Sequence, residues 1–146
     1  MLTRHLAPLL TAALLAAMPV AAQETPAPDD ARVYFVNLED GATVTSPVTV
    51  IFGLSGMGVA PAGTEKEMTG HHHLLVNRPA FGSEDAEELA FGIPADDNHV
   101  HFGGGQTETV VELPPGTHTL QLVMGDLNHV AHVAPVMSEV ITITVE

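Results

Sequence analysis

The chain has 146 residues, with 18 acidic against four basic side chains, a formal net charge of −14 and no cysteine. A surface of this sign repels nucleic acid and anionic lipid, so neither is expected as a partner. The absence of cysteine excludes thiol nucleophiles, disulfides and thiolate metal sites. Imidazole, carboxylate and thioether groups remain as metal ligands.

The first 22 residues predict a cleavable secretion signal. Arg4 gives a positive start, an apolar run rich in Leu and Ala follows to Val20, and the small residues before position 23 favour cleavage after Ala22. The run is shorter than the roughly 20 residues that a membrane-spanning helix needs. We therefore expect a periplasmic or secreted protein with no membrane span in its mature form; an uncleaved membrane anchor is the alternative.

Residues 23–31 (QETPAPDDA) predict a solvated tether, and residues 32–146 predict a single folded domain. Short β-branched runs separated by Gly and Pro turns predict about seven strands. Only Ser83–Phe91 has the pattern of a short helix, with Ser83 as its N-cap. The fold class is therefore all-β, an immunoglobulin-like antiparallel β-sandwich, with a small barrel as the alternative. The strands are expected at 32–38, 48–54, 70–77, 98–102, 107–113, 118–124 and 137–146.

Histidines are the unusual feature of this domain, which holds eight of the nine in the chain. Because side chains alternate across a strand, His71 and His73 share the face opposite His72, Leu74 and Val76. The latter set resembles a core face, so His71 and His73 are expected to point outward together, and the same reasoning applies to the pair at 99 and 101. Two such pairs on neighbouring strands would place four imidazoles within reach of one ion.

This clustering predicts a copper or zinc site, because neutral imidazole suits both metals. The candidate ligands are all histidines: His71, His73, His99, His101, His129 and His132. Acidic residues in the loops (Asp96, Asp97 and Asp126) could add ligands or orient the imidazoles. Four methionines (Met57, Met68, Met124 and Met137) could serve a cuprous ion, although methionine is commonly core filler.

Other interpretations remain open. The histidines could organise loops by hydrogen bonding in a structural domain of the cell envelope that contacts a protein or glycan, without metal. His118 and His72 fit satisfied core histidines. A metal-dependent enzyme is a third hypothesis, but no serine lies in a nucleophile elbow and no carboxylate pair has a catalytic spacing. The sequence thus favours a binding module over an enzyme.

Several motifs resemble one bacterial family, domain of unknown function 4399. They are GHHHLLVN, HFGGGQTE, LPPGTHTLQLVMGDLNHVAHVAPVMSE and VITITV, and the likeness spans residues 33–145. The resemblance implies an exported single domain and no assigned activity.

The segment from Asp40 to Val48 (DGATVTSPV) is similar to exported immunoglobulin-like domains, including copper carriers with a CopC-like sandwich. Those carriers place histidine ligands near the mature N-terminus, whereas Gln23-Glu24-Thr25 has none. This likeness therefore implies a sandwich and carries over no copper ligand.

Overall fold

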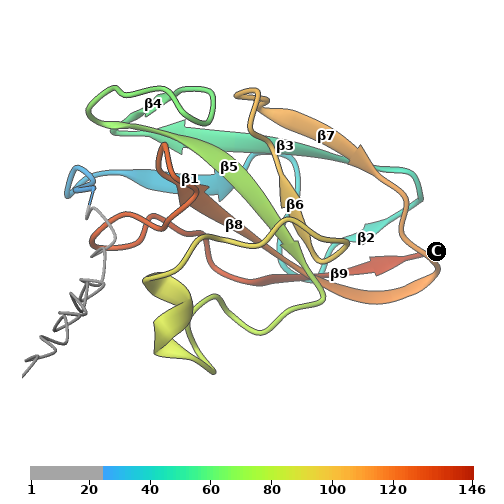
Figure 1. Cartoon of the computed structure of the whole chain (residues 1–146). Coiled ribbons are helices and arrows are strands. Elements are labelled where there is room, and N and C mark those ends of the chain that lie inside the picture. The colour runs from blue at the N-terminus through green and yellow to red at the C-terminus, as the bar shows by residue number, and fades with distance from the viewer. Residues whose placement is uncertain (1–24) are drawn as a thin grey trace, which may run out of the picture.

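The structure, a computed structural model, describes residues 25–146, so the predicted signal over residues 1–22 lies outside the described residues. Two β-sheets make up the domain (Figure 1). The smaller sheet has three antiparallel strands in the order β1-β3-β7. Their bounds are β1 (Arg32–Phe35), β3 (Val48–Ser55) and β7 (Glu108–Val111).

The larger sheet has six strands and carries the paired histidines. Its centre is β8 (Gly116–Gly125), which pairs antiparallel with β5 (Thr69–Val76) and with β9 (Ile141–Val145). The other edge of β5 is shared by β4 (Gly58–Val59), in parallel, and β6 (His99–His101), antiparallel; β2 (Thr43–Val44) runs parallel to β9. The predicted all-β sandwich is confirmed, and the two-residue strands β2 and β4 add to the seven expected.

The main core fills the space between the two sheets. Val50 and Phe52 of β3 pack with Leu74 of β5 and Leu122 of β8, and each is at most 5 % exposed. The inward faces follow the period of two that a half-buried strand requires. The prediction that His72, Leu74 and Val76 share the core face is therefore confirmed.

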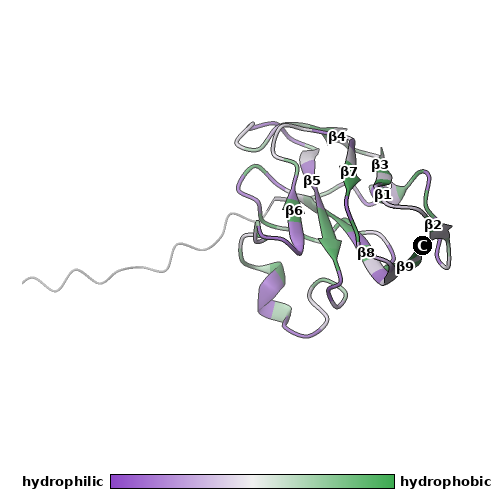
Figure 2. Ribbon diagram, turned by 90° about the vertical axis from the view of Figure 1, so that its right-hand side faces the viewer, coloured by the Kyte–Doolittle hydropathy of each residue, from purple (hydrophilic) through white to green (hydrophobic). Residues whose placement is uncertain are grey.

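The opposite face of the larger sheet is covered as well. Leu75 and Val123 point to this side and pack against Phe81, Ile93 and Ala131. These partners come from two long connections, residues 77–98 between β5 and β6 and residues 126–140 after β8 (Figure 1). All eight residues of β5 are consequently buried. In Figure 2 this strand changes from hydrophilic at its histidines to hydrophobic at its Leu-Leu-Val end.

The connection between β5 and β6 contains a short 3₁₀ helix, η1 (Ala86–Leu89). Asp85 caps it, because its carboxylate accepts a hydrogen bond from the Glu87 amide at 2.9 Å. The predicted helix over Ser83–Phe91 was therefore too long, and the predicted cap was wrong. The Ser83 amide instead closes a turn onto the Ala80 carbonyl.

Residues 25–31 run alongside the domain. The Val133 amide donates to the Thr25 carbonyl at 2.9 Å, and Ala31 enters the main core at 6 % exposure. Within residues 25–146, no helix has both the length and the apolar character needed to cross a membrane.

Candidate metal centre

The pairing of β5 with β6 brings two of the histidine pairs side by side. His73 lies directly opposite His101, and Leu75 lies opposite His99. On the other edge of β5, His71 lies opposite Gly125 of β8. The sequence predicted that two such strands could be neighbours, and the sheet register makes them so.

Three imidazoles meet at this point of the sheet. The ring centroids of His71 and His73 are 4.9 Å apart, and each lies 5.0 Å from the ring of His101. One nitrogen from each ring lies within 4.8 Å of the other two. We refer to His71, His73 and His101 as the histidine triad.

The closest approach is between His71 and His73, whose Nε2 atoms are 3.1 Å apart. Two nitrogens bound to one zinc ion at about 2.0–2.1 Å lie about 2.9–3.4 Å apart for angles between 90° and the tetrahedral value. The observed spacing thus already matches a bound pair. The third nitrogen, from His101, lies within 4.8 Å of the other two, so a rotation of its side chain would complete a three-imidazole site.

His129 approaches the triad from a loop. Its ring centroid lies 4.6 Å from His101, 5.0 Å from His71 and 6.3 Å from His73. It is half-buried and adopts a left-handed backbone conformation, with φ of 65°. Histidine is among the residues enriched in that region, so the turn carries little added strain. The loop therefore presents a fourth imidazole on the more exposed side of the triad.

Two glycines make room for the rings. A Cβ atom on Gly125 would lie 2.8 Å from Nε2 of His73 and 3.4 Å from Nε2 of His71. A Cβ atom on Gly103 would lie 2.4 Å from Cε1 of His101. The glycine run at 103–105, expected as a tight turn, contains positive φ at Gly105 and also leaves space for an imidazole.

Burial governs the protonation of the triad. His71 and His73 are 0 % exposed and His99 is 4 % exposed, which corrects the expectation that these rings point outward into solvent. Loss of hydration lowers the pKa of His71 to about 4 and that of His73 to about 3, and neighbouring imidazoles add to both shifts. The pKa of His101 is lowered by burial and then by His129. These rings are therefore neutral at pH 7, which is the form that binds metal.

Hydrogen bonding leaves the triad incompletely paired by protein groups. One of the two rings at 71 and 73 donates its Nε2–H to the other, and neither Nδ1 atom has a partner within residues 25–146. Nε2 of His101 is also buried without one. Buried polar atoms are normally paired, and although His72, His99 and His132 also carry unpaired nitrogens, only the triad brings such rings together at one point, as a binding site requires.

A buried carboxylate lies beside the triad. Asp126 is 1 % exposed, and its negative charge raises the pKa of His71 against the effect of burial. Its oxygens accept hydrogen bonds from the Asn128 and Val130 amides and from the Thr25 hydroxyl. The carboxylate therefore organises the turn that holds His129 and supplies negative charge next to the three neutral rings.

The other two predicted ligands have different surroundings. Nδ1 of His99 bonds to the Asp96 carboxylate at 2.8 Å, which lowers the pKa of Asp96. Nε2 of His99 is buried and has no partner in the part of the chain that the structure describes. His132 is buried against Gly70, and its Nε2 bonds to the Thr69 carbonyl at 3.3 Å. Neither belongs to the group of rings that meets at the triad.

The two histidines expected in the core are both buried. His118 donates from Nε2 to the Pro114 carbonyl at 2.8 Å and accepts at Nδ1 from the side-chain Nδ2 of Asn77 at 3.0 Å, so the prediction of a satisfied core histidine is confirmed for His118. His72 packs its ring on Phe52 at 5.0 Å, but neither of its ring nitrogens has a hydrogen-bond partner within residues 25–146, so the prediction is right about its burial and wrong about its hydrogen bonding. Burial lowers its pKa to about 4, and the Gln106 backbone partly offsets the shift.

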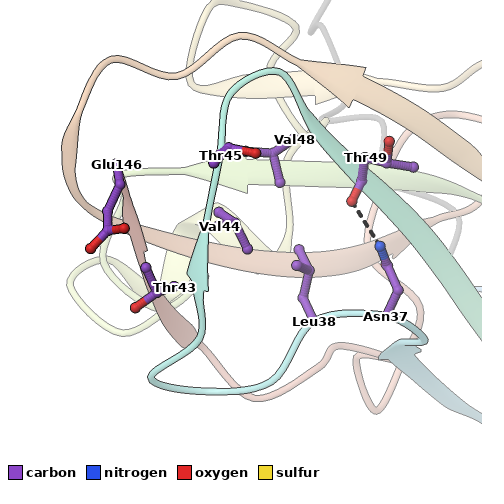
Figure 3. A pocket seen from close by; sticks show the side chains of 8 residues that line it. All are labelled: Asn37, Leu38, Thr43, Val44, Thr45, Val48, Thr49 and Glu146. Carbon is purple, nitrogen blue, oxygen red and sulfur yellow. Dashed lines mark hydrogen bonds between the residues drawn. The ribbon is translucent and has the colours of Figure 1, made fainter.

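The surface hollows described for the domain lie away from these rings. One of them holds about 440 Å³ and opens beside β2, the start of β3 and Glu146 (Figure 3). No histidine lines it; its residues are Asn37, Leu38, Thr43, Val44, Thr45, Val48, Thr49 and Glu146. This hollow therefore lacks the clustered imidazole groups that make the triad a candidate metal site.

Comparison with known proteins agrees with the motifs. No curated protein and no solved structure matches the chain. Residues 50–146, which include all eight histidines of the domain, match a family described as a domain of unknown function, DUF4399. The chain thus belongs to the DUF4399 family.

Proposed function

We propose that this chain is an exported metal-binding domain that holds one copper or zinc ion through His71, His73 and His101, with His129 as a fourth ligand. Its role would be to buffer, deliver or sense the metal in the periplasm or outside the cell. Export rests on the signal pattern of residues 1–22. The choice of metal follows from a donor set made only of imidazoles, which suits copper and zinc.

The observation that carries this proposal is the convergence of three buried ring nitrogens within 4.8 Å of one another. They come from two paired strands of a sheet, so the backbone fixes their spacing before any ion binds. His71 and His73 are already at ligand spacing, so binding would require His101 alone to move closer, which favours affinity. Gly125 and Gly103 support the same interpretation because larger residues would displace the rings.

The electrostatics favour a cation at this point. Protons compete with metal for imidazole nitrogen, and the lowered pKa values of His71 and His73 leave both rings free of that competition at neutral pH. Asp126 supplies a buried negative charge beside them. Burying a carboxylate is costly unless hydrogen bonds and an opposite charge compensate it, and a bound metal ion would supply that charge.

The alternative, a structural envelope domain without metal, requires histidines that bond to the backbone and organise loops. His118 has that arrangement, with both ring nitrogens paired to protein groups. The triad has the opposite arrangement: within residues 25–146, three of its ring nitrogens lack a hydrogen-bond partner and two more pair only with each other. This contrast within one domain favours metal binding over the alternative.

The test is a competition titration of the purified protein, free of any histidine tag, with Zn(II), Cu(II), Cu(I) and Ni(II) against chelators of known affinity. We expect one ion per chain and a loss of about 100-fold or more in affinity when His71, His73 and His101 are all changed to Asn. His132→Asn is the matched control, because His132 is equally buried and lies outside the triad. Equal affinities for the triple variant and the control would refute the proposal.

A further inference from the structure

The buried carboxylate of Asp126 connects two parts of the chain that lie 101 positions apart. Its Oδ2 accepts a hydrogen bond of 2.7 Å from the hydroxyl of Thr25. Its Oδ1 accepts from the amides of Asn128 at 2.8 Å and Val130 at 3.0 Å. One carboxylate thus joins the N-terminal segment to the turn that follows β8.

That turn determines where the His129 ring lies. The His129 amide donates to the Asp126 carbonyl at 3.0 Å, and the Asp126 amide donates to the Val130 carbonyl at 2.8 Å. The His129 carbonyl accepts from the Ile93 amide at 2.6 Å. The first two of these bonds involve Asp126, while the Gly63 amide donates to the Leu127 carbonyl at 3.0 Å and Gly92 bridges to Val130. Asp126 is therefore one of several anchors of the turn, and loss of its contacts would loosen the backbone that carries the His129 imidazole.

The N-terminal segment is attached at this point by few contacts. Besides the hydroxyl bond of Thr25, the Thr25 carbonyl accepts from the Val133 amide at 2.9 Å, and Pro26 forms a single parallel bridge to Val133. Thr25 is half-buried and Pro26 is exposed. Terminal segments held by a small number of hydrogen bonds detach more readily than the strands they cover.

We propose that the hydrogen bond between Thr25 and Asp126 is a latch that positions His129 as the fourth ligand of the metal. With the latch closed, the ion has four imidazole nitrogens; with the segment detached, the turn loosens and the ion keeps the triad alone. The N-terminal segment thereby sets the rate at which metal is released. This inference rests on the proposed function, because it assigns Thr25 and Asp126 as positioning residues for that site.

The three triad histidines and His129 are held by different kinds of structure, which supports separate roles for them in the latch. The triad histidines lie on β5 and β6, where the sheet register fixes them independently of the N-terminus. His129 lies on a loop, is half-buried and reaches 4.6 Å from His101 but only 6.3 Å from His73. A ligand held by a loop exchanges more readily than ligands held by paired strands, so the latch acts on the one position that can move.

The test compares Thr25→Val, which removes the hydroxyl and keeps the shape, with Thr25→Ser, which restores it. The control is Thr117→Val, at an exposed strand position of β8. Three measurements are made: amide hydrogen exchange at Asn128 and Val130 in the metal-free protein, the electron paramagnetic resonance spectrum of the Cu(II)-loaded protein, and the rate of Zn(II) transfer to a chelator. His129→Asn supplies the reference for loss of the fourth nitrogen.

We expect Thr25→Val to speed exchange at both amides and Zn(II) release by about tenfold, as loss of a bond to a charged group implies. Its Cu(II) spectrum should shift toward that of His129→Asn, while Thr25→Ser and Thr117→Val should match the unmodified protein. If Thr25→Val binds and releases metal as the unmodified protein does, while His129→Asn differs, the latch is wrong and the metal site stands. If the unmodified protein binds no metal, the proposed function itself fails. Should Thr25→Val unfold, an unchanged release rate in Asp126→Asn would overturn the latch.

Discussion

Lowering the pH from 7 to 5 should destabilise the metal-free protein, because it holds three histidines neutral in its interior. Burial lowers the pKa to about 4 for His71 and His72 and to about 3 for His73, against 6.5 in an unfolded chain. Below pH 6.5 the unfolded state takes up protons that the folded state does not. The stability contributed by these groups is therefore complete above pH 6.5 and is lost as the pH falls through the unfolded pKa toward the folded values.

The magnitude follows from the size of the window. Each histidine that stays neutral in the folded state lowers the free energy of unfolding by about 1.4 kcal/mol for every pH unit below 6.5. At pH 5 this amounts to about 2 kcal/mol per group. Because the rings at 71 and 73 are coupled, the combined loss is on the order of 4–6 kcal/mol, a large part of the stability of an ordinary domain. The net charge of −14 falls in the same pH range, which relieves repulsion and acts in the opposite direction.

The assay is urea denaturation of the metal-free protein, with a chelator present, at pH 7.5, 6 and 5. We expect the free energy of unfolding to fall as the pH is lowered. In His72→Gln, which removes one buried titrating group, the dependence of that free energy on pH should correspond to about one proton fewer taken up on unfolding. A free energy that stays level between pH 7.5 and 5 would refute the neutral burial of these rings.

Three further outcomes follow from the same contacts. Gly125→Ala should lower metal affinity by about tenfold with little loss of stability, since its Cβ would lie 2.8 Å from Nε2 of His73; unchanged affinity would contradict that role. Because burial lowers the pKa of the triad histidines, chelator competition should show nearly constant metal affinity from pH 7.5 to about 5.5 and a decline toward pH 4. A decline centred near 6.5 would indicate solvated ligands. His118→Leu should cost about 1–3 kcal/mol in thermal unfolding, because the Asn77 amide and the Pro114 carbonyl lose their partner, and should leave metal affinity unchanged; a loss of metal binding would place His118 in the site.

The strand periodicity predicted the faces of the sheet but not their burial. Alternation assigned His72 and Leu74 to the core and His71 and His73 to the opposite face, and the structure places them so. The opposite face was expected to meet solvent because a sandwich normally leaves its outer faces open. Residues 77–98 and 126–140 cover it, and their apolar residues, such as Phe81 and Ile93, are too sparse to form a recognisable pattern.

The sequence predicted that histidines would cluster, but it did not show which other residues surround them. His129 joins the triad through a turn set by the Asp126 carboxylate, whose partner Thr25 lies in a segment that the sequence indicates as a solvated tether. Side-chain hydrogen bonds across 101 positions leave no periodic signal. Gly125 offered the one available clue, since glycine at the end of a buried strand often marks close approach by a neighbouring group.

X-ray absorption spectroscopy of the protein loaded with one equivalent of Cu(II) or Zn(II) tests the central claim most directly. It reports the atoms bound to the metal and distinguishes imidazole rings by their outer-shell scattering. We predict three or four imidazole nitrogens at about 2.0 Å, and one fewer in His101→Asn. A ligand shell dominated by oxygen, or one unaffected by that substitution, would contradict the assignment of His71, His73 and His101 as the metal site.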